Sequence, residues 1–242
     1  MKESSDIENQ KYVIPRDSSG GIVKSDGGSL TTAEKLFKNC QIVTADGKLA
    51  SDLGLAVSDG RIVSVGRNEM LPEANQVVNL EGNVLLPGVI DCHVHTRTPG
   101  HEYKEDWRTA TAAAAAGGVT TIIAMPNTEP ILDRPSRVNS SFETAADDAH
   151  VDYQTHVVVT AENLDQLSDL AKSGIAGFKV FLGITFGDIE APNDGALLDA
   201  MDRISSLDKR LGFHEENDEI RAYLENQFEK KGKTDAIYHN RS

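Results

Sequence analysis

The alternation of hydrophobic and polar positions divides the chain into two parts with different periods. Between residues 36 and 80, short apolar runs rich in β-branched residues are separated by turn sequences such as Ser58-Asp59-Gly60. Short runs bounded by Asp-Gly turns are typical of β-hairpins. They predict a small antiparallel sheet, with strands over residues 36–44, 53–57, 61–65 and 77–80.

After residue 84, each apolar run of strand length is followed by a longer helical run, such as the alanine-rich stretch that ends at Gly117-Gly118. A glycine pair of this kind suits the C-terminus of a helix. Strands that alternate with helices indicate parallel β/α units. Five units are visible, with strands over residues 89–95, 119–125, 153–159, 176–182 and 211–214 and helices over residues 107–116, 135–147, 163–173, 194–206 and 218–229.

Two α/β architectures are built from such units. A closed (β/α)8 barrel of the TIM type takes about 250 residues, so residues 84–242 have room for about five of its units and the sequence predicts a truncated barrel. The alternative is an open, doubly wound sheet, but no glycine fingerprint for a dinucleotide phosphate follows the first strand. The barrel is therefore the favoured fold.

These patterns predict three segments. Residues 1–32 are rich in Ser, Gly, Asp and Lys without periodicity, and we expect a flexible leader. Residues 33–83 form the small sheet, and residues 84–242 form the partial barrel.

Composition narrows the class of protein. With 39% hydrophobic residues among 242, the chain can bury a core. Its formal net charge of -14 argues against a nucleic-acid partner, because an acidic surface repels phosphate. No apolar run approaches the roughly 20 residues of a membrane helix, and no secretion signal is visible, so we expect a cytoplasmic protein without a membrane partner. The two cysteines, Cys40 and Cys92, are expected to be reduced core residues.

The most informative stretch is the strand predicted over residues 89–95. Side chains alternate along a strand, so His93, His95 and Arg97 point one way, while Cys92 and Val94 point the other. Neutral imidazole is a common ligand of zinc, and two imidazoles on one strand are held together without ordering a loop. Two histidines on an exposed strand face also occur by chance, so this pattern alone leaves a metal site open.

Further polar residues stand at or near the carboxyl ends of the other strands, where barrel active sites lie: Asn127, His156, Lys179 and His214. Lys179 is unusual because Phe178, Val180 and Phe181 surround it in the sequence. Loss of hydration lowers the pKa of a lysine and leaves an amine that can act as nucleophile, form a Schiff base or capture carbon dioxide as a carbamate. A structural ion pair is the plainer alternative.

These residues lie in motifs that closely resemble those of the dihydroorotases of the amidohydrolase superfamily. The motifs are PGVIDCHVHTRTPG over residues 87–100, EYKED over 102–106, AAAGGVTT over 114–121 and AMPNT over 124–128. The resemblance covers residues 36–242. It implies a metal-dependent hydrolase barrel, together with a small β-sandwich of which residues 33–83 are one portion.

The resemblance also implies a centre of two divalent metal ions, usually zinc. His93 and His95 match the ligand pair on the first strand, Lys179 matches a carboxylated lysine that bridges both metals, and His214 matches a ligand of the second metal. Arg97 and Asn127 match the pair that holds the carboxylate of dihydroorotate, and Thr185 and Phe186 resemble the loop pair that covers the substrate. His101 and His156 match no ligand position, and we interpret both as structural.

Three differences separate the chain from the patterns of dihydroorotases or of hydantoinases. Thr98 stands where the family usually has a glutamate. Ile184 stands where hydantoinases carry a tyrosine, and this difference favours a dihydroorotase. A further metal histidine and the aspartate that moves the proton, both implied by the resemblance, have no matching position, so the catalytic base is left unassigned.

Three hypotheses follow. The first is a dihydroorotase of pyrimidine biosynthesis, seen here as an incomplete chain, which cyclises N-carbamoyl-L-aspartate to dihydroorotate and is a homo-oligomer when complete. The second is an allantoinase or a hydantoinase (dihydropyrimidinase) that acts on another cyclic ureide. The third is a non-catalytic relative that serves as a scaffold.

Overall fold

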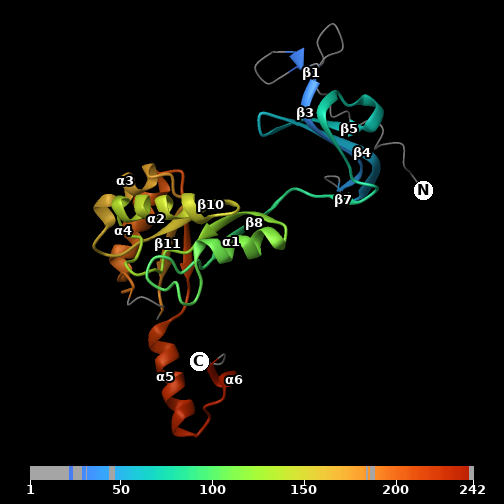
Figure 1. The fold of residues 1–242 in the computed structure, drawn as a ribbon. Helices are drawn as coiled ribbons and strands as arrows, with labels where there is room; N and C mark the ends of the chain where they lie inside the picture. The colour runs from blue at the N-terminus through green and yellow to red at the C-terminus, as the bar shows by residue number, and fades with distance from the viewer. Residues whose placement is uncertain are drawn as a thin grey trace, which may run out of the picture. The chain divides into compact units, whose positions relative to one another are not determined.

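The computed structural model describes residues 22–23, 29–30, 32–43, 47–183, 185 and 189–239. Most of the predicted leader, residues 1–32, therefore lies outside the described residues, as do residues 44–46. The chain divides into two compact units, Met1–Pro87 and Gly88–Ser242, which are considered separately below (Figure 1).

The first unit is a sheet built around its longest strand, β3 (Thr32–Val43). Beside it lie β4 (Leu49–Ser58), β5 (Arg61–Arg67), β6 (Glu73–Asn79) and the short β7 (Val84–Leu85), while β1 (Ile22–Val23) pairs with β2 (Ser29–Leu30). The order is β5-β4-β3-β6.

The expectation of a purely antiparallel sheet is wrong for one half of this unit. Strand β3 pairs antiparallel with β4, as the hairpin turns predict, but it runs parallel to β6 and β7. The 3-10 turn η1 (Asn68–Met70) lies on the crossover from β5 to β6. Ala33, Leu36 and Ala56 form the small core of this sheet.

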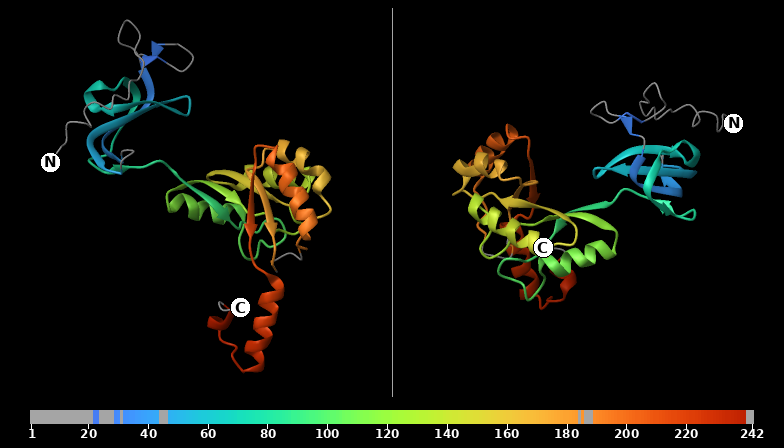
Figure 2. Two further views of the ribbon diagram at one scale, coloured as in Figure 1. Left: turned by 180° about the vertical axis from the view of Figure 1, so that it is seen from behind. Right: turned by 45° about the horizontal axis from the view of Figure 1, so that its top comes forward.

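The second unit contains the five predicted β/α strands: β8 (Val89–Val94), β9 (Val119–Ala124), β10 (Asp152–Val158), β11 (Gly177–Phe181) and β12 (Arg210–His214). Every neighbouring pair is parallel, and the strands lie in sequence order from β8 to β12 (Figure 2). A doubly wound sheet reverses its order at a switch point. Such a reversal does not occur between β8 and β12, so this half-barrel has the strand order of a β/α barrel.

Helices cover one face of this sheet. They are α1 (Trp107–Ala116), α2 (Pro135–Asp148), α3 (Leu167–Lys172) with the preceding 3-10 turn η2 (Leu164–Gln166), and α4 (Asp194–Ser205). The side chain of Asp106 caps α1, that of Asn193 caps α4, and Gly118 follows α1 with a φ of 82°. One-sided cover is expected because right-handed crossovers in sequence order place all helices on the same face.

Helix α5 (Asp218–Lys230) differs from the preceding four. Asn217 caps its N-terminus, and the short α6 (Ala236–His239) follows it. None of the residues of α5, all of which are described, is buried. The helix was predicted correctly, but it is not packed into the helical layer that covers the sheet.

The main core lies between the half-barrel and this helical layer. Phe178 and Val180 of β11 are fully buried there against Leu167, Leu170 and Ile204. Because side chains alternate along a strand, Lys179 points to the opposite, inner face of the half-barrel. The sequence of β11 thus places a structural core and a charged amine on opposite faces of one strand.

An ion-pair cluster joins the loop before α2 to the first turn of that helix. The carboxylate of Asp133 accepts hydrogen bonds from Arg134 at 3.0 Å and from Arg137 at 2.8 Å. Burial alone would raise the pKa of Asp133, but the two guanidinium groups outweigh it and hold the pKa below its usual value. The stabilisation is therefore complete above the unfolded-state pKa of about 3.9 and is lost as the pH falls through the folded-state pKa.

Replacing Asp133 with asparagine is expected to lower the free energy of unfolding by about 1 kcal/mol at pH 7, and by progressively less below about pH 4. Urea unfolding of both proteins between pH 3 and pH 7 measures this difference. Asp169→Asn is the matched control, because the Asp169–Lys172 pair is more than 70% exposed at both side chains and should contribute almost nothing. A difference that stays constant across this pH range would contradict the argument.

Candidate metal and substrate site

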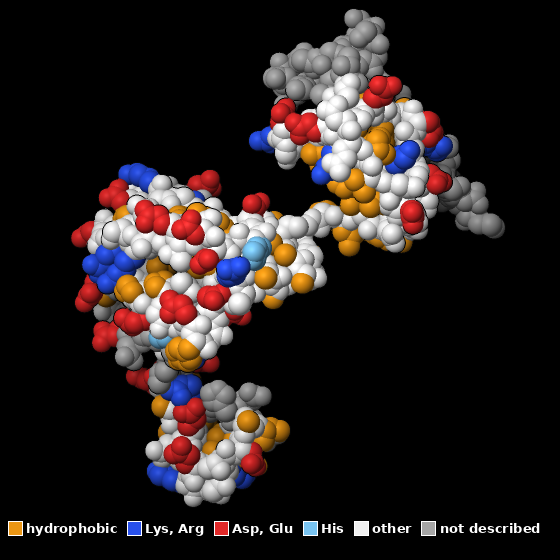
Figure 3. Space-filling model, viewed as in Figure 1, with side chains coloured by type: hydrophobic (Ala, Val, Ile, Leu, Met, Phe, Trp, Pro, Cys, Tyr) orange, Lys and Arg blue, Asp and Glu red, His pale blue; other side chains and the backbone are white. Residues whose placement is uncertain are grey.

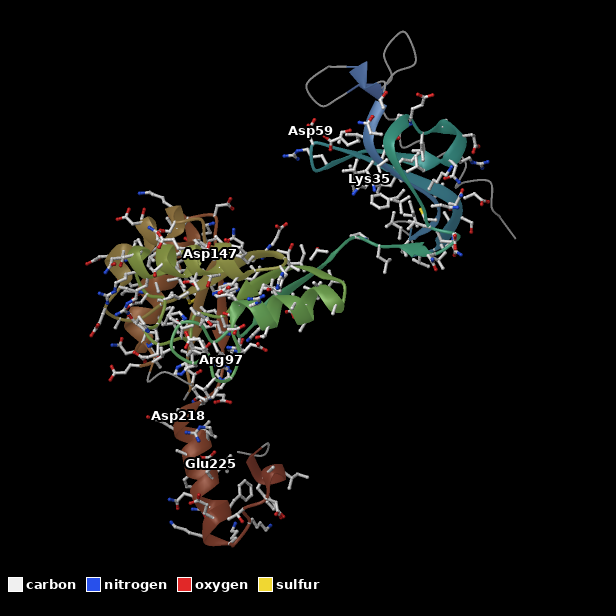
Figure 4. The ribbon with its side chains drawn as sticks, viewed as in Figure 1. Lys35, Asp59, Arg97, Asp147, Asp218 and Glu225 are labelled. Atoms are coloured by element: carbon white, nitrogen blue, oxygen red, sulfur yellow. The ribbon has the colours of Figure 1, made fainter. Side chains whose placement is uncertain are left out.

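The predicted site residues lie at the carboxyl end of the half-barrel. The five strands are parallel, so their carboxyl ends share one edge of the sheet. Figure 4 shows Arg97, which follows β8, near this edge and close in the view to Asp218, where α5 leaves β12. The loops that follow β8, β9, β11 and β12 therefore begin in one region.

His93 and His95 lie side by side at the end of β8, as the alternation predicted. Their ring centroids are 5.4 Å apart, and the backbone N–H of His93 donates to the Asp91 carboxylate at 3.1 Å. Burial lowers the pKa of both imidazoles, and the nearby charges of Lys179, for His93, and of Arg97, for His95, lower it further. Both rings are therefore neutral at pH 7, which is the form that binds a metal ion.

Lys179 reaches the same region from β11. The residue is only 6% exposed, and its Nζ donates to the backbone carbonyl of Phe213 at 2.8 Å. Burial lowers the pKa of this amine, whereas the charge of Glu215 opposes that shift. A lysine held in this way has an increased fraction of the neutral amine, which is the nucleophilic form.

His214 ends β12 directly opposite Phe181 in the strand register. The ring of Phe181 lies near both functional groups, 5.4 Å from the Lys179 Nζ and 6.0 Å from the centroid of the His214 ring. His214 Nε2 lies 3.5 Å from the carboxylate of Glu216. His214 thus faces the same side of the sheet as Lys179 and remains partly exposed.

The predicted substrate residues surround His95. The amide oxygen of Asn127 lies 2.8 Å from His95 Nδ1, and the amide nitrogen of Asn127 lies 3.4 Å from Thr185 Oγ1. Arg97 has a φ of 62°, and its carbonyl accepts a hydrogen bond from the backbone N–H of His101 at 3.0 Å. Phe186, the remaining predicted substrate residue, lies outside the described residues, as does Ile184.

One contact was not found from the sequence, and the sheet face of one histidine was not assigned. The direct contact between Asn127 and His95 depends on loop conformation, which residue spacing does not specify. His156 lies on the inner face of β10, where a Cβ added at Gly177 would come within 3.4 Å of its Nδ1. Burial lowers its pKa. The alternation of β10 with the buried, outward Val157 could have assigned His156 to this face.

Cys92 corrects a further expectation. The thiol of Cys40 is buried, as predicted, but Cys92 is exposed, although it was expected to belong to the core. The reason is its position on β8, which is an edge strand of the half-barrel and is exposed along most of its length.

The donor set fits divalent metal ions by its chemistry. His93 and His95 have lowered pKa values, and a buried amine with a lowered pKa lies within electrostatic reach of both. Among the described residues, no three His, Cys, Asp or Glu side chains gather tightly enough to hold an ion by themselves. Lys179 is therefore a candidate donor in addition to the imidazoles.

Comparison of the sequence with known families matches it to the model of the family described as "Dihydro-orotase-like", over residues 82–228. A dihydroorotase from Clostridioides difficile is 30% identical over 186 residues, which are 75% of this chain and 42% of the relative. An allantoinase from Enterococcus faecalis is 32% identical over 195 residues, which are 76% of this chain and 42% of the relative.

Solved structures of a hydantoinase and a dihydropyrimidinase also match this chain. The L-hydantoinase (dihydropyrimidinase) from Arthrobacter aurescens matches with a TM-score of 0.80 and 25% identity, over 86% of this chain and 46% of that protein. A dihydropyrimidinase from Brevibacillus agri matches with a TM-score of 0.71 and 29% identity, over 85% of this chain and 45% of that protein. The predicted barrel fold is confirmed, and the chain spans less than half the length of the relatives it matches.

Proposed function

The chain belongs to the dihydro-orotase-like family of amidohydrolases, and from this premise we propose that the whole protein is a dihydroorotase, which interconverts N-carbamoyl-L-aspartate and dihydroorotate. The observation that carries the proposal is Lys179, a buried lysine with a lowered pKa that lies within electrostatic reach of His93 and His95. Burial of a charged lysine costs folding free energy, and such perturbed titratable groups gather at functional sites.

In this proposal, His93, His95, Lys179 and His214 would hold two divalent cations, with zinc as the expected metal. The neutral amine of Lys179 would bond to the carbon of carbon dioxide and release a proton, giving a carbamate with two oxygens that can face two cations. When bound, the cations would lower the pKa of a water molecule and polarise the cyclic amide carbonyl.

The substrate would be oriented by residues beside the metal ligands. Arg97 offers a planar fork of donors that suits the carboxylate of dihydroorotate. The amide nitrogen of Asn127 and the hydroxyl of Thr185, 3.4 Å apart, are positioned to add further hydrogen bonds. Fixing the carboxylate in this way aligns the amide carbonyl with the centre, and such alignment contributes several kcal/mol in enzymes.

Replacing Arg97 with alanine is expected to raise the KM for dihydroorotate about 10- to 100-fold, because a hydrogen-bonded charge pair contributes about 1.5–3 kcal/mol. The zinc content should be unchanged. Steady-state kinetics and metal analysis measure the two quantities. Arg108→Ala, on the exposed side of α1, is the control and should behave as the wild type. If the zinc content fell with Arg97→Ala, the role assigned to Arg97 would be wrong.

A second candidate function is supported by the relatives. The allantoinase matches at 32% identity, and the structural match at a TM-score of 0.80 is to a hydantoinase. An allantoinase or a hydantoinase would use the same metal ligands on another cyclic ureide. Assays of the full gene product with dihydroorotate, allantoin and a hydantoin decide between them. Turnover of dihydroorotate at the highest kcat/KM is the expected result, and a clear preference for either of the others would overturn the first proposal.

Metal analysis separates both enzymes from a non-catalytic scaffold. A scaffold has no need to retain metal ions or a carbamate on Lys179. About two zinc ions per chain of the full gene product, with a carbamate signal after growth in 13C-labelled bicarbonate, would support an enzyme. Absence of both would favour the scaffold.

The proposed partner is a small, anionic carbamoyl amino acid or its cyclic form. The chain carries 38 acidic and 24 basic side chains, and Figure 3 shows the acidic ones spread over the viewed face, which opposes binding to nucleic acid. No helix in the described part of the chain is long and apolar enough to cross a membrane. We further propose a cytoplasmic location and, for the whole protein, a homo-oligomer.

The first unit is proposed to be one portion of a β-sandwich. Leu49 is 55% exposed and Ile62 is 64% exposed, although both lie on strands of its sheet. Large apolar side chains on a sheet are usually covered by a second packed layer. A second sheet over this unit would bury them.

A further inference from the structure

Asn127 touches a predicted metal ligand directly. Its amide oxygen lies 2.8 Å from Nδ1 of His95, which is a normal hydrogen-bond distance. Asn127 is 3% exposed and His95 is half-buried, so water does not compete freely for this contact. An amide oxygen can only accept a hydrogen bond, so the proton of the contact belongs to His95 Nδ1.

The position of this proton decides what the other ring nitrogen can do. A neutral imidazole carries one proton, and a proton on Nδ1 leaves the lone pair of Nε2 free. Histidines that bind metal ions commonly donate their second N–H to a carboxylate or carbonyl oxygen, which fixes both the tautomer and the ring orientation. The Asn127 oxygen is placed to accept such a hydrogen bond from His95.

The loop that carries Asn127 is itself held in place. The backbone N–H of Met125 donates to the carbonyl of Val94 at 2.7 Å, which ties the end of β9 to the end of β8. The carbonyl of Pro126 accepts hydrogen bonds from the N–H groups of Thr128 and Leu132. On the far side of the amide, the Asn127 nitrogen faces Thr185 Oγ1 at 3.4 Å. Asn127 thus follows two residues whose backbone is held by hydrogen bonds, and its side chain is held at both ends of its amide.

We infer that Asn127 is a positioning residue for His95: its amide oxygen holds the Nδ1–H tautomer and directs Nε2 to the metal ion, while its amide nitrogen faces Thr185 and the substrate. This inference rests on the proposed function for the metal and the substrate. It gives the Asn127 amide two roles. Its oxygen orients the metal ligand His95, and its nitrogen lies beside Thr185, which is proposed to contact the substrate.

The test uses two measurements on the full gene product. Nitrogen-15 NMR of its metal-free form, with the signals assigned through a His95→Gln variant, reports which nitrogen of His95 carries the proton. Titration with zinc chloride gives the dissociation constant. The wild type is expected to show the Nδ1–H tautomer. Asn127→Ala should lose this preference and bind zinc about 10- to 100-fold more weakly, which is the usual effect of removing such a partner.

Two further variants separate positioning from a merely structural effect. Asn127→Asp keeps an acceptor at the same place and should retain the Nδ1–H tautomer and zinc affinity within a few-fold of the wild type. Asn163 is the matched control, because it is also buried and its amide donates to the carbonyls of Asp133 and Val158, away from any histidine. Asn163→Ala should destabilise the fold and leave both readouts unchanged.

The outcomes distinguish this inference from the proposed function. An unchanged tautomer and zinc affinity in Asn127→Ala would overturn the positioning role while leaving the dihydroorotase proposal in place. Equal losses in Asn127→Asp and Asn127→Ala would overturn it as well. A full gene product that shows the Nδ1–H tautomer but binds no zinc would contradict the proposed metal centre, and the NMR result would still establish the hydrogen bond.

Discussion

Replacing Lys179 with alanine is expected to remove the metal centre and reduce kcat/KM of the full gene product by about a thousandfold or more. Lys179 is the one predicted ligand that is buried, so no water or other side chain can readily take its place. The two cations proposed to contact its carbamate supply several kcal/mol of transition-state stabilisation, and each 1.36 kcal/mol corresponds to a tenfold change in rate. Metal analysis and steady-state kinetics with dihydroorotate measure both effects.

Lys209 provides a matched control for this substitution. Its Nζ also donates to a backbone carbonyl of the neighbouring strand region, that of Ile175, at 2.6 Å. However, Lys209 precedes β12 and Ile175 precedes β11, so this contact lies at the amino ends of the strands, away from the predicted centre. Lys209→Ala therefore removes a comparable lysine and hydrogen bond and should retain full zinc content and activity.

Comparing the two variants also identifies the result that would contradict the assignment of Lys179 as a metal ligand. If Lys179→Ala kept its zinc and its activity, the lysine would be structural, as the ion-pair alternative holds. If both variants lost zinc equally, the effect would come from the folding of the sheet. Growth in 13C-labelled bicarbonate adds a direct readout, because the carbamate signal should be present in the wild type and in Lys209→Ala and absent in Lys179→Ala.

The β/α half of the fold was predictable because its signals are local. Apolar residues recur in each strand from β8 to β12, and helix ends are marked by residues such as Asp106, Asn193 and Gly118. Right-handed crossovers then fix the order of the strands without further information. The pairing of β6 with β3 was missed because it joins residues about 40 positions apart, and no turn sequence encodes it.

Part of the site was also predictable from the sequence. Strand alternation placed His93 and His95 together, and the apolar neighbours of Lys179 indicated its burial. The contact of Asn127 with His95 was not predictable, because it depends on how the ends of β8 and β9 are joined by the hydrogen bond between Met125 and Val94. Local sequence thus specifies which residues face the site, whereas loop geometry decides which of them touch.

The stability of this site depends on the opposite face of β11. Phe178 is fully buried among the residues of α3 and α4, and it neighbours Lys179 in the chain. Replacing Phe178 with alanine is expected to lower the free energy of unfolding by about 3–5 kcal/mol, because the loss of a buried aromatic ring leaves a cavity that its neighbours fill only partly. This is a large fraction of the roughly 5–15 kcal/mol that stabilises a typical domain.

The single tryptophan of the chain, Trp107, lies in the core of the second unit and reports on it selectively in urea unfolding. Phe228→Ala is the matched control: Phe228 stacks on Tyr238 at a centroid distance of 5.3 Å, but it lies on α5, where no residue is buried. Its loss should cost less than about 1 kcal/mol, since surface substitutions usually have small effects. Equal costs at the two positions would mean that the half-barrel core does not carry the stability assigned to it. A large cost at Phe178 alone would mean that the packing on the outer face of β11, behind Lys179, stabilises the part of the fold that carries the proposed metal centre.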